Sequence, residues 1–266
     1  MADARFVSRP FFSAHPVFRR EEYARAVRRD PADKVVSAML TQHLNAGNIR
    51  RVARGVFASV PPHGDPETWT VDRFLAASRL KPDAVIAYHS ALELHGCAYT
   101  DMPDVQAITG EEPTLFETAD FACRFLKRPK GFVATRDVTT ADRLGLDVRI
   151  TTLERTIVDV FDRPDLAGGA EELVNSLALV ERIKPDPLLR QAQGLRNAGA
   201  VAALGWWLES AQKRLAIPDA VLARLRTLKP KHPRYVLGAK SGDAKSIPGW
   251  NILLPRNLAD PSFEGA

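Results

Sequence analysis

The stretch from Asp30 to Ser59 constrains the fold more than any other part of the chain. Asp30 is a good helix N-cap, and Pro31 suits the first helical position, where its missing N–H costs nothing. Gly47 is suited to end that helix in the left-handed conformation. Two short β-prone runs follow, with Arg54 and Gly55 at the bend, so the stretch predicts a helix followed by a β-hairpin. Apolar residues recur at helical spacing and predict one buried helix face, made of Val35, Val36, Met39, Leu40 and Leu44.

The opposite face of this predicted helix suits contact with DNA. Past Asp33 the helix contains no acidic residue. Hydroxyls and amides are the groups that pair with base edges and phosphates. Three guanidinium groups lie on or near the hairpin tip, where we expect them to grip phosphates or probe the minor groove. The simpler alternative is a core helix and a hairpin whose arginines are only solvated. The candidate DNA-binding residues are Lys34, Ser37, Thr41, Gln42 and Asn45 on the helix, and Arg50, Arg51 and Arg54 on the hairpin.

A second helix is predicted before this stretch, over Val17–Val27. Helix, turn, helix and hairpin together predict a winged helix-turn-helix, in which the second helix usually lies in the major groove. Phe6, Phe11 and Phe12 predict an amino-terminal arm that packs on this module. The run from Val60 to Pro66 holds three prolines and a glycine, which predict a domain boundary. We expect a winged-helix DNA-binding domain with its arm over residues 1–62 and a larger domain over residues 63–266.

The larger domain is predicted to be mixed. Helical patterns are found over 68–80, 84–94 and 151–161, and in several segments between 170 and 228. Between about Asp104 and Ile150 the apolar period drops towards two, in runs that begin at Val105, Phe121, Phe132 and Leu146. These runs predict strands of a mostly antiparallel sheet. The fold class is therefore α+β, with a winged helix-turn-helix followed by a larger domain that combines an antiparallel sheet with several helices.

Charge is distributed unevenly along the 266 residues. Residues 1–62 hold 11 Lys/Arg against 5 Asp/Glu, residues 63–210 hold 16 against 23, and residues 211–266 hold 10 against 4. A basic head beside an acidic middle is expected if the head meets phosphate, with chance unevenness as the alternative. The sequence has no apolar run long enough for a membrane span and no signal pattern. Two isolated cysteines, Cys97 and Cys123, are typical of a protein in a reducing cytoplasm, with a disulfide between them as the alternative.

Three blocks of sequence resemble the AbiEi family of antitoxins and transcriptional regulators. They are GNIRRVARGVFASVP from Gly47, AYHSALELHG from Ala87, and ITTLERTIVDVFDRPDLAGG from Ile150, in that order and spacing. The resemblance covers roughly Val17 to Asn175, and the aromatic arm before Val17 departs from it. It implies a winged-helix head that binds operator DNA and represses its own operon. It also implies a second domain that counters a nucleotidyltransferase toxin encoded next door, in the type IV manner, without obligatory direct binding of the toxin.

Candidate catalytic residues do not form a recognisable site. His89 and His95 are six residues apart, which does not give the i, i+4 arrangement that grips zinc. The sequence contains no Walker loop or dinucleotide fingerprint, so we expect no cofactor, no metal site and no catalytic residue. Arg155 and Asp159 are four apart in the most family-like block, and we expect them to pair and to stabilise the fold.

We therefore expect a cytoplasmic, sequence-specific DNA-binding antitoxin that is not an enzyme. Its partners would be an inverted-repeat operator in double-stranded DNA and, functionally, a nucleotidyltransferase toxin. The alternative is a protein-binding antitoxin or other regulator whose carboxy-terminal domain holds a partner directly. The basic tail can bind an acidic partner, supply a second nucleic-acid surface, or be a solvated loop; its cations are Lys229, Lys231, Arg234, Lys240 and Lys245.

Overall fold

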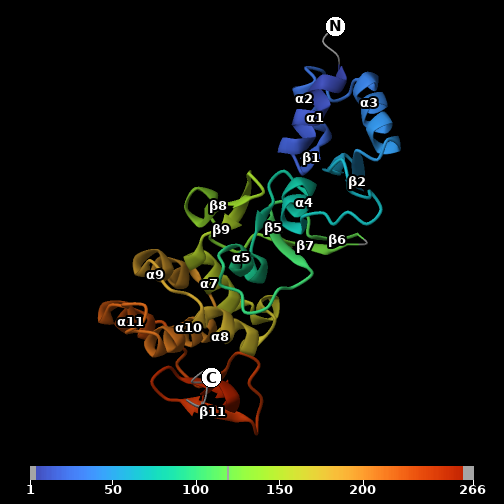
Figure 1. Cartoon of the computed structure of the whole chain (residues 1–266). Helices are drawn as coiled ribbons and strands as arrows, with labels where there is room; N and C mark the ends of the chain where they lie inside the picture. Colours follow the sequence, from blue (N-terminus) through green and yellow to red (C-terminus); the bar gives the residue numbers. More distant parts are fainter. Residues whose placement is uncertain (1–3, 119, 260–266) are drawn as a thin grey trace. The chain divides into compact units, whose positions relative to one another are not determined.

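The computed structural model describes residues 4–118 and 120–259 (Figure 1). By the contacts between its residues the chain divides into two compact units. The first contains residues 1–86, 103–127 and 140–149, and the second contains residues 87–102, 128–139 and 150–266. The boundary expected after residue 62 falls inside the first unit, so a separately folding head stays a prediction.

The amino-terminal module of the first unit has the element order of a winged helix. Its three strands form one sheet in the order β1-β3-β2. This arrangement agrees with the predicted helix-turn-helix and wing. The elements are α1 (Ala4–Ala14), β1 (Val17–Arg19), α2 (Arg20–Ala26), α3 (Lys34–Asn45), β2 (Ile49–Ala53) and β3 (Val56–Ser59).

The helix predicted over Val17–Val27 is wrong in its first three residues, which form β1. This strand pairs antiparallel with β3, so that Phe18 lies opposite Phe57 and their rings stack with centroids 5.6 Å apart. Strand pairing and ring burial override the local helical spacing here. Helix α2 then begins at Arg20, and the Glu22 carboxylate accepts a hydrogen bond from the backbone N–H of Arg19 at 2.6 Å.

Helix α3 begins later than the sequence predicts. Its N-cap is Asp33, whose carboxylate accepts a hydrogen bond from the backbone N–H of Val35 at 2.8 Å. The predicted cap, Asp30, instead accepts from the N–H of Ala32 at 2.7 Å. Asp30 therefore organises the turn before the helix, because Pro31 and Ala32 lie in that turn.

The predicted end of α3 is confirmed. Gly47 takes a φ of +70°, in the left-handed region. Its N–H donates to the carbonyl of Leu44 at 3.1 Å, and the N–H of Asn48 donates to the carbonyl of His43 at 3.0 Å. This pair of hydrogen bonds is the Schellman pattern, which satisfies carbonyls that the helix end leaves free.

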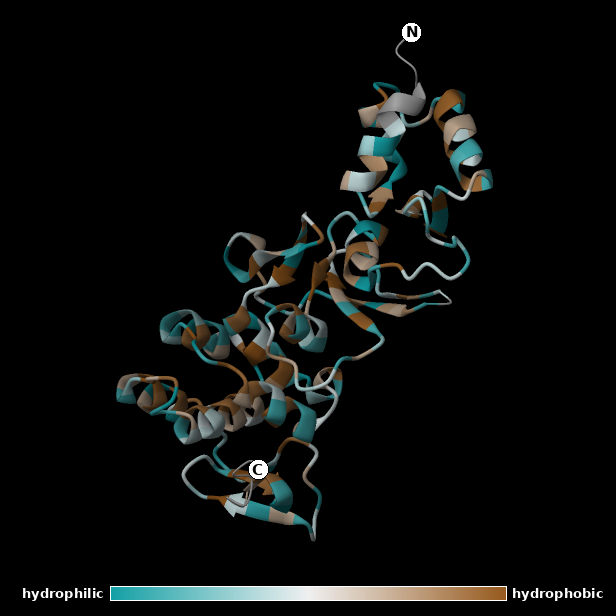
Figure 2. Cartoon of the chain, in the orientation of Figure 1, coloured by the Kyte–Doolittle hydropathy of each residue, from teal (hydrophilic) through white to brown (hydrophobic). Residues whose placement is uncertain are grey.

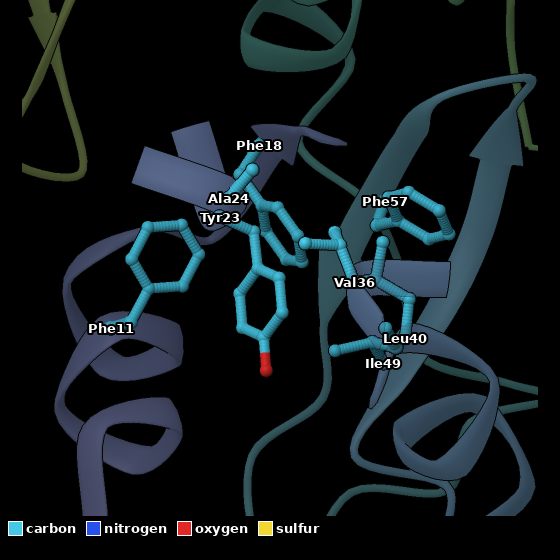
Figure 3. Close-up of a cluster of buried hydrophobic side chains, with 8 residues drawn as sticks. All are labelled: Phe11, Phe18, Tyr23, Ala24, Val36, Leu40, Ile49 and Phe57. Carbon is cyan, nitrogen blue, oxygen red and sulfur yellow. The ribbon is translucent and has the colours of Figure 1, made fainter. Parts of the chain in front are cut away.

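One cluster of buried side chains joins α1, α2, α3 and the wing (Figure 3). Phe12, Met39 and Leu44 pack at its edge. The predicted arm is thus a helix that supplies part of the core, while the Phe6 side chain lies outside the described residues. The cluster consists of Phe11, Phe18, Tyr23, Ala24, Val36, Leu40, Ile49 and Phe57.

The predicted buried face of α3 is wrong at Val35. Its side chain is 42% exposed, whereas Val36 is fully buried. Adjacent residues of a helix point about 100° apart, so the two valines cannot face the same core. Figure 2 shows hydrophobic and hydrophilic residues following one another along α3, as expected for a helix with one buried side.

Helix α4 (Arg73–Leu80) and most of a six-stranded sheet complete the first unit. The strand order is β6-β7-β5-β4-β9-β8. Strands β5 and β7 are parallel, whereas β4–β5 and β6–β7 are antiparallel, so the sheet is mixed, and two of these three pairings are antiparallel as predicted. The strands are β4 (Val85–Ile86), β5 (Val105–Thr109), β6 (Thr114–Glu117), β7 (Ala122–Lys127), β8 (Val138–Arg143) and β9 (Leu146–Thr151).

Three other predicted elements differ from the structure, and local hydrogen bonds explain two of the differences. The helix predicted over 68–80 begins only at Arg73, because the Asp72 carboxylate caps it by accepting from the N–H of Leu75 at 2.9 Å. The strand predicted at Phe132 is absent, and helix α6 (Ala134–Asp137) follows instead. There the Asp137 carboxylate accepts from the N–H of Val133 at 2.8 Å and closes a turn. The helix predicted over 84–94 starts as strand β4.

The second unit is mainly helical. The helix predicted over 151–161 is confirmed as α7, which begins at Leu153 with Thr152 as its N-cap. A small sheet in the order β10-β12-β11 follows the helices. No helix in the described part of the chain is both long and apolar enough to cross a bilayer. The main elements are α5 (Tyr88–Leu94), α7 (Leu153–Asp162), α8 (Ala170–Ala178), α9 (Pro185–Gly194), α10 (Ala198–Ser210), α11 (Asp219–Arg226), β10 (Arg234–Tyr235), β11 (Ala244–Ile247), β12 (Ile252–Pro255) and α12 (Arg256–Ala259).

Candidate nucleic-acid interface

The outward side of α3 carries most of the predicted DNA-binding side chains. Lys34, Thr41, Gln42 and Asn45 are exposed, on the side opposite Val36 and Leu40. Ser37 is half-buried, and its hydroxyl accepts a hydrogen bond from Nη2 of Arg20 at 2.8 Å. The helix therefore presents one ammonium, one hydroxyl and two amides to solvent, with Ser37 held at the edge of that surface.

Arg20 positions the turn that leads into α3, a role that the sequence pattern does not reveal. Its guanidinium donates to the backbone carbonyls of Pro31 and Asp33 as well as to Ser37. A second arginine, Arg29, donates to the Asp33 carboxylate at 2.9 Å. The hydrogen bond from the Val35 backbone, followed by that from Arg29, lowers the pKa of Asp33 below its usual value. The cap at the start of α3 thus stays ionised and ordered near neutral pH.

The three wing arginines are not equivalent. Arg51 and Arg54 are exposed, and the Arg51 guanidinium lies over the Phe57 ring, 5.7 Å from its centroid. Arg50 is half-buried and forms an ion pair with Asp120, while its Nη1 donates to the carbonyl of Trp69 at 2.8 Å. Arg51 and Arg54 are therefore available to a ligand as they stand, whereas Arg50 is engaged within the first unit.

A cavity of about 640 Å³ lies in the first unit beside the turn of the wing. Its cations include Arg25 and Arg54, which are exposed, and Arg149 from β9. Arg19 and Arg79 also line it, but Arg19 donates to the Arg79 carbonyl at 2.6 Å. Sequence reasoning missed Arg25 and Arg149, because nothing in their local pattern links them to the wing. Glu21, Glu22 and Asp147 line the same cavity, so Arg25 and Arg149 add two cations near Arg54 within a lining of mixed charge.

Polar groups inside the head hold α3 against α1. The Ser8 hydroxyl lies 3.0 Å from the Tyr23 hydroxyl and 3.1 Å from Nε2 of His43, which is a residue of α3. Burial raises the pKa of Tyr23 and lowers the pKa of His43, so both side chains are neutral at neutral pH. Hydrogen bonds between neutral groups fix the rotation of α3 and with it the side that faces outward.

In the second unit, the predicted pair of Arg155 and Asp159 is confirmed. The guanidinium donates two hydrogen bonds to Asp159, at 2.8 and 2.7 Å, and one to Gln191 at 3.2 Å. Asp137 lies 3.6 Å away on the same guanidinium. Burial alone would lower the pKa of Arg155, but the hydrogen bonds with Asp159 raise it. This buried network ties α6, α7 and α9 together, which is a structural role.

His89 is a second buried polar centre of the second unit. Its Nδ1 lies 3.2 Å from Glu93 and its Nε2 lies 3.0 Å from Glu172. Both nitrogens can donate to carboxylates only in the doubly protonated ring. Burial alone would lower the pKa of His89, but the hydrogen bonds to the two carboxylates outweigh it and raise that pKa. Among the described residues, no group of three or more His, Cys, Asp or Glu side chains could hold a metal ion.

The fold defines a chain that combines a winged-helix module with a larger mixed α/β part. A solved structure with this fold is the RV2827C protein from Mycobacterium tuberculosis, at a TM-score of 0.64 and 18% sequence identity. The similarity covers 97% of this chain and 94% of that one. At this identity it shows a shared fold over nearly the whole length. No family model matches the sequence. A comparison with curated proteins likewise gave no match.

Proposed function

We propose that the chain is a sequence-specific DNA-binding protein that reads duplex DNA through α3 and the wing. The observation that carries the proposal is exposure: within one module, α3 exposes hydroxyl and amide side chains and the wing exposes the guanidiniums of Arg51 and Arg54. The Asp33 carboxylate is hydrogen-bonded as the N-cap of α3, and the helix beyond Asp33 has no acidic residue. Base edges in the major groove pair with amides and hydroxyls, and phosphates pair with arginine.

In this proposal Gln42 and its exposed neighbours on α3 enter the major groove. Gln42 and Asn45 are the side chains that can pair in two-point fashion with adenine. Val35 joins them as an apolar contact for a thymine methyl group, since its exposure leaves it on the rim of the same surface. Arg51 and Arg54 would hold phosphates, and an inverted-repeat operator would require two heads about one helical turn apart.

The antitoxin role rests on the resemblance to the AbiEi family described above. We propose that the chain represses its own toxin–antitoxin operon and counteracts a nucleotidyltransferase toxin. Its place would be the cytoplasm, which suits the free and buried thiols of Cys97 and Cys123. A gene for a nucleotidyltransferase next to the gene for this chain is the simplest observation that would support this role.

A second candidate is a protein-binding antitoxin or another regulator whose second unit holds its partner directly. Large apolar side chains exposed on that unit favour this alternative. Tyr99 is 62% exposed and Leu179 is 47% exposed. The backbone of Tyr99 is hydrogen-bonded to Ser176, three residues before Leu179, so both side chains belong to one region. An apolar region of this kind is typical of contacts between proteins.

Two experiments separate these candidates. A gel shift of the full chain with the DNA upstream of its own gene tests operator binding, with a shuffled sequence of equal length as control. Pull-down of the neighbouring gene product tests direct binding, and Tyr99→Asp should abolish it if the second candidate is right. An operator shift without toxin capture supports the type IV proposal. No shift above the shuffled control would refute sequence-specific binding.

A further inference from the structure

The second unit contains a basic cavity of about 870 Å³ beside the first turn of α10. Asp162 is the one acidic residue among the described residues that line this cavity. Its carboxylate accepts a hydrogen bond from the Asn197 side chain at 3.0 Å. The cavity wall therefore presents an excess of positive charge. Its basic side chains are Arg196, Lys229, Lys231, His232 and Arg234.

These cations are not neutralised within the described part of the chain. Arg196, Lys231 and Arg234 are exposed, and none of them forms an ion pair with a described carboxylate. Lys229 donates a hydrogen bond to the backbone carbonyl of Gly249 at 2.9 Å, which is an uncharged partner. Several like charges around one cavity repel each other and lower the cost of bringing in an anion.

The wall that carries Arg234 is held in place by close packing. A Cβ on Gly199 of α10 would lie 3.1 Å from the Val236 side chain, which would have to shift by a few tenths of an ångström to admit it. Strand β10 also pairs in parallel with β12, and the N–H of Arg234 donates to the carbonyl of Asn251 at 3.1 Å. Arg234 therefore extends from an ordered strand.

An aromatic ring lies among these cations. Tyr235 lines the same cavity, and its side chain is 53% exposed. Cations that track a phosphate together with an exposed aromatic ring are the combination that binds unpaired nucleotides, because a base with a free face can stack on the ring. A duplex keeps its base faces inside the stack and cannot use Tyr235 in this way.

We propose that this cavity binds a nucleotide unit with an unstacked base, its phosphate among Lys231, Arg234 and Arg196 and its base against Tyr235. The unit can be a free nucleotide or part of a single-stranded nucleic acid. The lining residues of this cavity all belong to the second unit, so the proposal does not depend on operator recognition by α3.

The test measures binding of the full chain to fluorescein-labelled oligoadenylate about eight nucleotides long, with ATP and inorganic phosphate as competitors. Lys231→Ala with Arg234→Ala should weaken binding about tenfold or more. Tyr235→Ala should also weaken it, and Tyr235→Phe should restore it, since phenylalanine keeps the stacking face. The matched control is Arg190→Ala with Lys213→Ala, two exposed cations of the same unit outside the cavity. Thermal melting of each variant checks that it is folded.

Each outcome decides the proposal. Competition by ATP supports a free nucleotide as one source, and binding of the oligonucleotide without such competition supports a single strand. Cavity variants that bind like the control pair would overturn the site. Inorganic phosphate that competes as strongly as ATP would reduce the cavity to an adventitious ion site only. Lys231→Ala with Arg234→Ala should leave the operator gel shift unchanged, which separates this test from that of operator binding.

Discussion

Removing the two exposed wing arginines should change how strongly salt weakens operator binding. Each phosphate neutralised by a protein cation contributes about 0.9 to the slope of log K against log salt. Arg51 and Arg54 are exposed, whereas Arg50 is paired with Asp120. We therefore expect Arg51→Ala with Arg54→Ala to flatten the slope by about 1.8. When salt rises from roughly 50 to 200 mM, the ratio of the wild-type to the variant association constant should then fall about 12-fold.

The assay is a fluorescence-anisotropy titration of labelled operator duplex at four or more salt concentrations. Arg50→Gln is the matched control on the same hairpin, and its slope should equal that of the wild type because its guanidinium is already engaged. An unchanged slope in the double variant would remove the wing from the binding surface. A slope flattened by about 0.9 in Arg50→Gln would show that the pair with Asp120 opens when DNA binds.

Three further predictions concern single side chains. Gln42→Ala should reduce discrimination between operator and random DNA by about 1–3 kcal/mol, measured by competition gel shifts, and equal loss on both DNAs would contradict base readout. Because the folded-state pKa of His89 is raised, its contribution to stability is complete below about pH 6.5 and is lost as pH rises through that raised pKa. The free energy of unfolding of the wild type, measured with urea, should therefore fall as pH rises over this window, and His89→Gln should remove this fall. Free energies of unfolding that change with pH in the same way in wild type and variant would contradict a charged His89. Arg155→Ala should destabilise the second unit by about 3–5 kcal/mol in denaturant unfolding, because it leaves the Asp159 carboxylate buried and unpaired, and a loss below about 1 kcal/mol would refute this role.

The local signals of the head were largely readable from the sequence. The outward side of α3, its end at Gly47 and the two-stranded wing follow from side-chain periodicity and from one glycine that must adopt positive φ. Such features depend on neighbours a few residues away. The same holds for the Arg155–Asp159 pair, whose members are one helical turn apart.

Features set by distant residues could not be predicted in this way. Strand β1 exists because it pairs with β3, about forty residues later, and the parallel pairing of β5 with β7 depends on the whole sheet. The engagement of Arg50 requires Asp120, which lies 70 positions further along the chain. In the candidate interface, Arg25 and Arg149 were missed for the same reason, since only the folded chain brings them near Arg54.

Under the proposed function, the short turn of the wing limits how DNA preference can change. Only Arg54 and Gly55 connect β2 to β3, and Gly55 adopts a φ of +79° that other residues rarely take. A single side chain therefore projects from the tip, where longer wings offer several. If relatives with this short turn prefer different minor-groove widths, the difference should map to the residue at position 54 rather than to the length of the loop.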